Sequence, residues 1–439
     1  MSEVNYPNKP PSYKLYDYDA IEKESEWKIH NVHDPALVKD GDYYYIFSTD
    51  CKVLAKDRQV PAGIQVRKSP DLIHWEWVGY ALSGVPEAAY QWTGASTLWA
   101  PDVCKLGDTY YLYYSASQFG KNQSFIGVAT SKSIDGPWID QGEVYKTEQG
   151  DPMNAIDPNI VIDHEGQPWM VYGSFFEGIY ITRINPQTGK LLEPGSGTLI
   201  ARRHHHVEGA VEGPYIIYNE QYKKYYLFVS YDSLFENYNI RVGRSESITG
   251  PYVDINGNRF TDIEHFPQSE VGNKILGSYS FAQDYGWIAP GHNSVLKDDQ
   301  EYFIAHHARG GKDKRWPYLH IRRILWTDNG WPVVSPQRYA GEKVQKLEGD
   351  EIKGIWEIIL LDRANNYQIK SIEIEISHQS NYRFESDKQT FYVSLNTPFI
   401  GGEFALKLLP AWDWEKDRPC LVFSGLDRQG LCLWGKKIA

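Results

Sequence analysis

The sequence predicts an all-β protein: a five-bladed β-propeller followed by a small antiparallel β-barrel or sandwich. Three observations support this prediction. One structural unit recurs five times along the chain, as expected for a repeat architecture. Aromatic residues make up 14% of the 439 residues, a composition that favours strands over helices. No segment shows helical periodicity longer than a turn or two.

The repeated unit consists of a short segment around a proline, a β-type run, a turn and an aromatic strand. This order is kept in every copy, the fifth copy being degenerate, and it favours a propeller over a two-sheet sandwich with accidental similarity. The copies begin at residues 34–38, 100–103, 157–161, 212–216 and 291–295. The aromatic strands are predicted at 43–47, 110–114, 169–172, 225–229 and 302–306.

The chain divides into three predicted regions. Residues 1–28 form an N-terminal extension, and residues 29–343 form the propeller. After Trp331-Pro332 the character of the sequence changes, and residues 371–376 alternate apolar and acidic side chains with the period of a half-buried strand. We therefore expect residues 344–439 to form the barrel or sandwich.

Composition excludes several classes of function. The net charge is −12 and no basic run is present, which argues against a nucleic-acid partner. No stretch approaches the roughly 18 apolar residues of a membrane helix, so we expect no membrane partner. Residues 1–18 lack a signal-peptide pattern, so we expect a cytoplasmic protein, unless a signal was removed. The four cysteines show no metal-binding spacing and are expected to be free thiols.

Charged side chains recur where the repeats begin. In a propeller the first strand of each blade lines the central axis, so Asp34, Asp157, Glu212 and His292 should meet in one pocket. Three neighbouring carboxylates shift one another's pKa values, as acid–base chemistry requires. Aromatic residues near the same strand starts offer flat surfaces for sugar rings: Trp92, Trp99, Phe175 and Phe176.

Simpler interpretations apply to each residue alone. A single Asp-Pro pair usually begins a turn. The presence of three carboxylates at equivalent repeat positions is what favours a functional role. Asp102 lies one residue past its proline and should face away from the axis, in a structural role. Glu208 is a rival to Glu212, and the run 204–206 of three histidines is interpreted as an exposed loop. The role of His292 is left open between that of a core histidine and that of a metal ligand.

Five motifs surround these positions: Val32-His33-Asp34-Pro35, Gly94-Ala95-Ser96-Thr97-Leu98-Trp99-Ala100-Pro101-Asp102-Val103, Ala155-Ile156-Asp157-Pro158-Asn159, Val211-Glu212-Gly213-Pro214-Tyr215 and Gly291-His292-Asn293-Ser294. They resemble glycoside hydrolase family 43, and within it the arabinanases, over residues 29–338. The resemblance implies a five-bladed propeller, in agreement with the repeat count.

The resemblance implies a role for each carboxylate. Asp34 would be the general base that activates water, Glu212 the general acid, and Asp157 the residue that raises the pKa of Glu212 and orients it. Inversion of configuration would follow, with carboxylates roughly 6.5–9.5 Å apart. The implied activity is endo-α-1,5-L-arabinanase, acting on arabinan or arabino-oligosaccharides.

The resemblance also implies binding residues. His292 would ligate an axial metal ion, usually taken as calcium, with waters as the other ligands. The C-terminal region resembles the extra β-barrel domain of two-domain arabinanases. The residues expected to contact substrate are Trp99, Ser174, Phe175 and Arg309.

Two departures from the family pattern leave alternatives open. The acid motif is Glu212-Gly213-Pro214, where arabinanases usually have alanine, and Phe175-Phe176-Glu177-Gly178 stands where a Trp and a Ser are more usual. An exo-acting α-L-arabinofuranosidase or a β-xylosidase would use the same carboxylates. A non-catalytic sugar-binding propeller would explain the aromatics but would not require three acidic side chains. The oligomeric state and the identity of the metal are left open.

Overall fold

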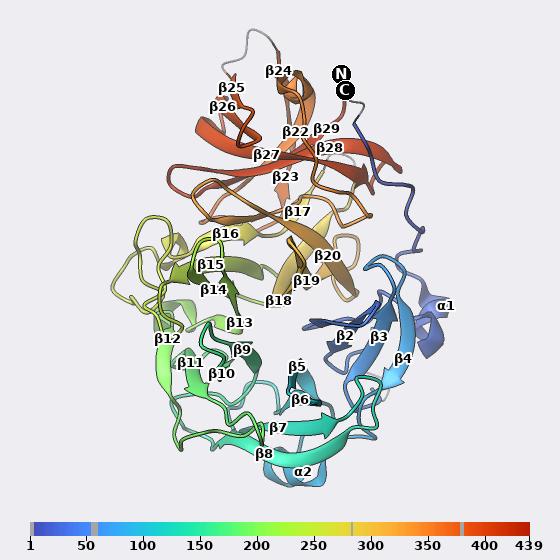
Figure 1. The fold of residues 1–439 in the computed structure, drawn as a ribbon, viewed down its shortest axis with the longest axis vertical. Coiled ribbons are helices and arrows are strands. Elements are labelled where there is room, and N and C mark those ends of the chain that lie inside the picture. Colours follow the sequence, from blue (N-terminus) through green and yellow to red (C-terminus); the bar gives the residue numbers. More distant parts are fainter. Residues whose placement is uncertain (1–3, 54–59, 282–283, 378–381) are drawn as a thin grey trace.

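The computed structural model describes residues 4–53, 60–281, 284–377 and 382–439. It confirms the predicted fold class, an almost all-β chain with five sheets arranged as propeller blades and one further antiparallel sheet (Figure 1). The blades follow one another around the axis in chain order, and the last sheet lies beside blades 4 and 5.

Blades 1 to 4 are four-stranded antiparallel sheets whose strands follow the chain order. Blade 1 contains β1 (Ala36–Asp40), β2 (Tyr43–Ser48), β3 (Gln65–Ser69) and β4 (Glu76–Tyr80). Blade 2 contains β5 (Trp99–Leu106), β6 (Thr109–Ala116), β7 (Ser124–Ser131) and β8 (Ile139–Thr147). Blade 3 contains β9 (Asn159–Ile162), β10 (Pro168–Tyr172), β11 (Ile179–Arg183) and β12 (Thr198–Ala201). Blade 4 contains β13 (Val211–Asn219), β14 (Lys224–Tyr231), β15 (Asn239–Ser245) and β16 (Asn273–Leu276).

Blade 5 is larger, because a strand from the C-terminal region joins it. Its strands are β17 (Tyr279–Ser280), β18 (Trp287–Asp298), β19 (Glu301–Gly310), β20 (Pro317–Trp326), β21 (Pro332–Val334) and β23 (Ile369–Lys370). The C-terminal sheet has the order β24-β22-β29-β28-β27-β26-β25. Its strands are β22 (Gly354–Leu361), β24 (Ile372–Ile376), β25 (Tyr382–Glu385), β26 (Thr390–Asn396), β27 (Gly401–Asp413), β28 (Arg418–Asp427) and β29 (Cys432–Lys437).

Two smaller predictions, on helices and cysteines, are also confirmed. The helices in the described ranges are short, and none has the length and apolar character needed to cross a membrane. All four cysteines are free thiols. The helices are α1 (Tyr18–Ile21), α2 (Glu87–Thr93), η1 (Glu24–Glu26), η3 (His205–Val207), η4 (Gln268–Glu270) and η5 (Gly349–Ile352).

The aromatic second strand of each blade lies inside the sheet and fills the space between blades. In β6, seven of the eight residues are buried, among them Tyr113 and Tyr114. The outer strand β8 is largely exposed or half-buried, as expected where a blade faces solvent. Aromatic and β-branched side chains pack well on such a pleated, buried surface, which explains the composition of the repeat.

Ser294 makes two of the hydrogen bonds that close the ring between the last and the first blade. Ser294 in β18 accepts a hydrogen bond from the Leu37 backbone N–H (2.9 Å) and donates one to the Pro35 carbonyl (2.7 Å). The segment before blade 1 strengthens this junction, because Ile29 accepts a backbone hydrogen bond from Leu319 in β20. Blades 1 and 5 are thus joined both at the axis and at a position farther out.

The C-terminal sheet shares a core with the propeller. Tyr279 in β17 pairs in parallel with Ile369 in β23, and a single hydrophobic cluster contains Trp316 of blade 5 together with Trp434 of β29. The propeller strands end at Val334, and β22 begins the C-terminal sheet. The predicted boundaries at residues 28/29 and 343/344 stay predictions.

We predict that Ser294→Ala destabilises the protein by about 1–3 kcal/mol, because the buried Leu37 N–H loses its acceptor. Thermal and urea unfolding measure the change, and the exposed Ser83→Ala is the control, with an expected change of less than about 0.5 kcal/mol. Equal stability of the two variants would show that this contact does not hold the ring closed.

Candidate active site

A cavity of about 1670 Å³ is lined by all eight residues that the sequence predicts as catalytic, substrate-binding or metal-binding. This volume exceeds the roughly 300–1,000 Å³ typical of small-molecule pockets. Its lining includes Asp34, Trp99, Asp157, Ser174, Phe175, Glu212, His292 and Arg309. The propeller therefore brings together side chains from all five blades, as expected where first strands begin at the axis.

The five blades share an unusual backbone conformation where their inner strands begin. The residue at the equivalent repeat position of each blade has a positive φ, and four of these five residues are not glycine. Such conformations are uncommon for residues with a Cβ and persist only where the surroundings enforce them. The five residues are Asp34 (φ 52°), Ala100 (φ 29°), Asp157 (φ 59°), Gly213 (φ 57°) and His292 (φ 46°).

A ring of hydrogen bonds enforces this conformation. The backbone N–H of each of these five residues donates to a side chain of the preceding blade, so that every blade fixes the strand start of the next. The donors and acceptors are Ala100 to Thr49 Oγ1 (2.7 Å), Asp157 to Ser115 Oγ (3.0 Å), Gly213 to Asp157 Oδ2 (3.1 Å), His292 to Ser230 Oγ (2.8 Å) and Asp34 to His307 Nδ1 (3.3 Å).

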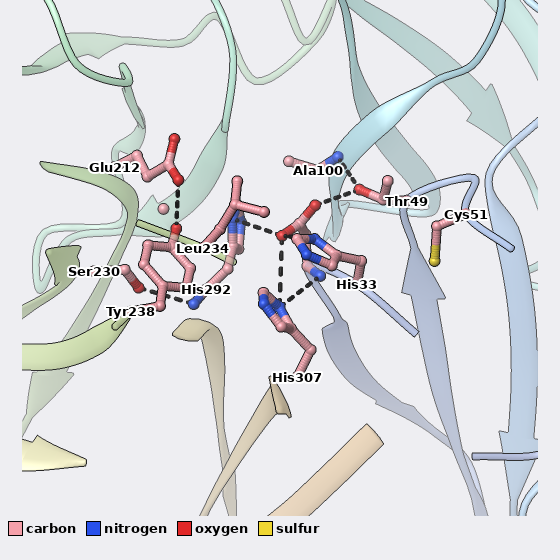
Figure 2. A network of polar contacts seen from close by, with 12 residues as sticks. His33, Thr49, Cys51, Ala100, Glu212, Ser230, Leu234, Tyr238, His292 and His307 are labelled. Atoms are coloured by element: carbon pink, nitrogen blue, oxygen red, sulfur yellow. Dashed lines mark hydrogen bonds and ion pairs between the residues drawn. The ribbon is translucent and has the colours of Figure 1, made fainter. Parts of the chain in front are cut away.

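Asp34 is buried among hydrogen-bond donors and imidazoles. Figure 2 shows the side chains of Thr49, His33, His292 and His307 that surround this position. Thr49 Oγ1 donates to its Oδ2 (2.5 Å), while the Nδ1 atoms of His33 and His292 lie 2.8 and 3.1 Å from its Oδ1. Burial alone would raise the pKa of Asp34, but the imidazoles of His33, His292 and His307 outweigh burial and hold this pKa well below its usual range. Asp34 is therefore ionised and can accept a proton.

Arg309 fixes the orientation of His33. Its Nη2 lies 3.1 Å from His33 Nε2, and its Nε and Nη1 donate to the carbonyls of Leu234 and Lys314. A guanidinium only donates hydrogen bonds, so His33 Nε2 is the acceptor and the proton of neutral His33 sits on Nδ1. His33 then donates to Asp34 Oδ1. Arg309 lines the cavity, and its role as a substrate contact stays a prediction.

Glu212 has the opposite electrostatic environment. Ser174 Oγ donates to its Oε2 (2.6 Å) and Tyr238 Oη to its Oε1 (2.8 Å). Burial raises the pKa of Glu212 and the charge of Asp34 adds to this rise, against these two hydrogen bonds and the charge of His292. The Tyr238 ring fits only because residue 291 is glycine: a Cβ there would lie 1.9 Å from the ring. Glu212 can thus hold a proton.

Asp157 connects the ring of hydrogen bonds to Glu212. Its Oδ2 accepts from the N–H of Gly213, the residue after Glu212, and lies 3.9 Å from His292 Nδ1. Burial and the charges of Glu212 and Asp34 raise the pKa of Asp157 well above its usual range, against that N–H. Asp157 therefore positions the backbone that carries Glu212.

The aromatic residues divide into two groups. Trp99, Phe175 and Phe176 line the cavity, as expected for sugar-stacking surfaces. Trp92 does not: its Nε1 donates to the Thr147 carbonyl, and Lys146 lies over its ring. The expectation for Trp92 is wrong, because Trp92 lies on α2, whose side chains pack against the outer strands of blade 2.

The other charged candidates behave as their simpler interpretations predict. Asp102 is buried away from the cavity lining, where it accepts from Asn159 Nδ2 (3.1 Å) and the Ile160 N–H (2.6 Å), and burial raises its pKa to about 7. Glu208 lies at the cavity rim with no hydrogen bond to the catalytic carboxylates among the described contacts. His204–His206 are partly exposed around η3 at the same rim.

One group of potential metal ligands exists among the described residues: His33, Asp34 and His307. His307 Nε2 is buried without a hydrogen-bond partner, whereas the Nδ1 of His292 faces Asp34. His307 Nδ1 accepts the Asp34 backbone N–H, so the proton of neutral His307 sits on Nε2, which cannot then ligate an ion. His292 has the opposite arrangement: its Nδ1 lies 3.1 Å from the Asp34 Oδ1 acceptor, which leaves Nε2 free for an axial cation, and the donor set therefore fits His292 as the ligand.

Sequence reasoning missed several residues that shape this site. His33 and His307 stand beside predicted residues, but adjacency gives no hint that both rings stack on each other at 3.7 Å next to Asp34. Tyr238 and the ring acceptors Thr49, Ser115 and Ser230 lie at the ends of predicted second strands or between strands. Thr49, Ser115 and Ser230 occupy equivalent positions in their blades, each opposite the start of the next blade's inner strand. An alignment of the repeats could have shown this shared position.

A propeller with buried carboxylates on its axis, one with a lowered pKa and one with a raised pKa, has the groups that glycosidic bond cleavage requires. The family model of glycosyl hydrolases family 43 matches residues 29–332, and a model described as a C-terminal lipocalin-like domain matches residues 336–435. The chain therefore belongs to glycoside hydrolase family 43.

Characterised relatives are similar over nearly the whole chain. An extracellular endo-α-(1→5)-L-arabinanase of Thermotoga petrophila is 32% identical, covering 97% of this chain and 97% of its own. Extracellular endo-α-(1→5)-L-arabinanase 2 of Bacillus subtilis is 30% identical, with 94% of both chains covered. The crystal structure of the endo-1,5-α-L-arabinanase from Thermotoga petrophila RKU-1 has a TM-score of 0.83 at 30% identity, covering 94% of this chain and 99% of that chain.

The relatives correct one expectation. We expected a cytoplasmic protein, but both of these relatives are named extracellular, which points to secretion. The cytoplasmic expectation is wrong because it was based only on the residues at the beginning of the sequence, which say nothing of a segment that precedes them.

We predict that Tyr238→Phe moves the alkaline limb of kcat/KM to higher pH. Activity falls with rising pH as Glu212 loses its proton, and the Tyr238 hydroxyl lowers the pKa of Glu212 by stabilising the carboxylate. Without this hydroxyl the pKa of Glu212 rises further. The pH profile measures the shift, with the exposed Tyr90→Phe as control. An alkaline limb that stays in place or moves to lower pH would contradict this electrostatic account.

Proposed function

We infer that this protein is an endo-α-1,5-L-arabinanase that hydrolyses arabinan with inversion of configuration. The observation that carries the inference is the opposite shift of two pKa values on one axis, lowered for Asp34 and raised for Glu212. The family and the two full-length arabinanase relatives supply the substrate class. An exo-arabinofuranosidase, a β-xylosidase and a non-catalytic sugar-binding propeller are not favoured by these relatives.

The proposed mechanism uses each carboxylate once. Glu212 donates its proton to the leaving glycosidic oxygen while the bond from that oxygen to the anomeric carbon breaks. A water attacks the same carbon from the opposite face, and Asp34 accepts the proton that this water loses. Thr49 and His33 hold the Asp34 carboxylate in place during the attack.

Asp157 positions the general acid Glu212 and does not activate the attacking water. It fixes the Gly213 N–H, and its own charge would raise the pKa of Glu212 whenever Asp157 is ionised. Tyr238 and Ser174 orient the two oxygens of Glu212. The acid is therefore held from three sides before substrate binds, which removes a reorganisation cost from the reaction.

The cleft fits a segment of a chain better than a single sugar. A cavity of about 1670 Å³ with Trp99, Phe175 and Phe176 on its walls has room and flat apolar surface for several furanose rings. This supports internal cleavage of the arabinan chain.

We propose that an axial cation, calcium by family resemblance, binds beside this site with His292 as the protein ligand and waters as the others. Calcium prefers oxygen ligands, so a site of this kind depends on its waters. The ion would supply positive charge near Asp34, which favours the ionised carboxylate.

The product pattern from debranched α-1,5-arabinan is the direct test of this function. We predict short arabino-oligosaccharides early in the reaction, measured by chromatography, with arabinoxylan and xylan as parallel substrates. Arabinose alone would mean exo action, activity only on xylan-type substrates would overturn the specificity, and no product from any substrate would favour the sugar-binding alternative.

Three variants serve as controls for this measurement. Asp34→Asn, Asp157→Asn and Glu212→Gln should each lower kcat by at least about 100-fold while the fold survives, as expected for loss of a general acid or base or of its support. Near-normal turnover in one of them would remove its assigned role.

Metal content is a separate prediction. Elemental analysis of the purified protein should find about one divalent ion per chain, and a chelator should lower the melting temperature, since an ion bound only to the folded state stabilises it. The His292→Ala variant should lose the ion. A protein without metal, or a melting temperature that a chelator leaves unchanged, would rule the proposal out.

A further inference from the structure

The loop 232–238, between β14 and β15, covers the catalytic cavity. Five of its residues line the cavity, and Leu234 lies between Glu212 and Thr49 in the view of Figure 2. The Phe235 ring lies 5.9 Å from that of Phe119, which belongs to blade 2. The loop thus reaches from blade 4 to a residue of blade 2, and substrate must enter beneath or beside it.

The same loop contacts Glu212 directly and reaches Asp34 through two side chains. At its end, Tyr238 donates a hydrogen bond to Glu212. In its middle, the Leu234 carbonyl accepts from Arg309, whose other nitrogen holds His33 against Asp34. A displacement of this loop would therefore change the cavity wall and the support of both carboxylates.

The beginning of the loop depends on Asp232, which has a φ of 71°. A non-glycine residue keeps this conformation only when its contacts enforce it. Its Oδ1 accepts from Arg203 Nη1 (2.6 Å), and its Oδ2 accepts from Asn239 Nδ2 (2.9 Å) and from Asn366 Nδ2 (2.7 Å). Arg203 and Asn239 belong to the propeller, but Asn366 belongs to the C-terminal region.

Asn366 is itself held in place by blade 4. Lys274 in β16 is buried, and its Nζ donates to Asn366 Oδ1 (3.0 Å), to the Asp362 carbonyl (2.9 Å) and to the Asn365 carbonyl (2.8 Å). Arg241 Nη2 donates to the carbonyl of Arg363 in the same segment (2.8 Å). Residues 362–366 are thereby fixed against the propeller, and Asn366 directs its amide at Asp232.

We propose that the C-terminal domain acts on the catalytic cleft, with Asn366 as a positioning residue that fixes the 232–238 loop through Asp232. The proposal rests on the proposed arabinanase function of the cleft and assigns the domain a role in substrate binding by the propeller itself. In this role the domain does not capture sugar on its own surface; it keeps the wall of the cleft in its binding position.

The chemistry of this contact allows a substitution with opposite effects on its two partners. In Asn366→Asp the new carboxylate still accepts from Lys274, and the opposite charge strengthens that contact. The same carboxylate faces Asp232, where like charges repel and the donated hydrogen bond is lost. Residues 362–366 therefore stay bound to Lys274, while the attraction between residue 366 and Asp232 becomes a repulsion.

The test measures KM for α-1,5-linked arabino-oligosaccharides together with amide hydrogen exchange in residues 232–238 of the full-length protein without substrate. For Asn366→Asp we expect KM to rise by about tenfold, the effect of losing one hydrogen bond to a charged group, and exchange in 232–238 to become faster. Asn366→Ala should change both in the same direction but less. Adding Asp232→Asn to Asn366→Asp removes the repulsion and should recover part of the lost affinity.

Asn365→Ala is the matched control, because this exposed neighbour offers Lys274 only its backbone carbonyl. It should leave KM and exchange unchanged. Unchanged KM or unchanged exchange in Asn366→Asp would overturn the proposal, as would an effect of equal size in Asn365→Ala. If Asn366→Asp does not fold, the same criteria apply to Asn366→Ala. Wild-type protein that binds and cleaves no arabino-oligosaccharide would instead refute the proposed function, and the exchange data would still decide whether Asn366 holds the loop.

Discussion

The active site depends on a ring of five hydrogen bonds in which each blade holds the first residue of the next blade's inner strand. The backbone N–H groups of Ala100, Asp157, Gly213, His292 and Asp34 are all satisfied in this way. A buried N–H without an acceptor costs about 1–3 kcal/mol, so the ring also stabilises the positive φ angles at these positions. The strained conformation aims the side chains of Asp34 and Asp157 at the axis, which links the stability of the fold directly to the geometry of catalysis.

The two sides of the axis differ in charge, although they are built from equivalent positions. Asp34 is surrounded by imidazoles and a threonine hydroxyl, which favour its ionised form. Glu212 is buried near other carboxylates, which favour its protonated form. Two carboxyl groups in one fold thus become a base and an acid because their neighbours differ. Arg309 contributes by keeping the proton of His33 on Nδ1, from which His33 donates to Asp34.

The sequence was sufficient for the fold and for most of the site, because both follow from the repeat. Equivalent positions in a propeller meet at the axis, so Asp34, Asp157, Glu212 and His292 could be placed without a structure. Residues outside the repeat could not be placed in this way. Tyr238 reaches Glu212 only because Gly291 leaves room for its ring, and Asn366 reaches Asp232 across 134 residues of sequence. Trp92 was wrongly placed in the site, because it lies close to Trp99 in sequence but belongs to α2, which directs it away from the cavity.

Neutron diffraction at neutral pH measures how protons are divided between Asp34 and Glu212. We expect a deuteron on the Glu212 carboxyl, none on Asp34, and the His33 deuteron on Nδ1 facing Asp34. A protonated Asp34 together with an ionised Glu212 would contradict the proposed mechanism, because the water would then lack its base and the leaving oxygen its acid.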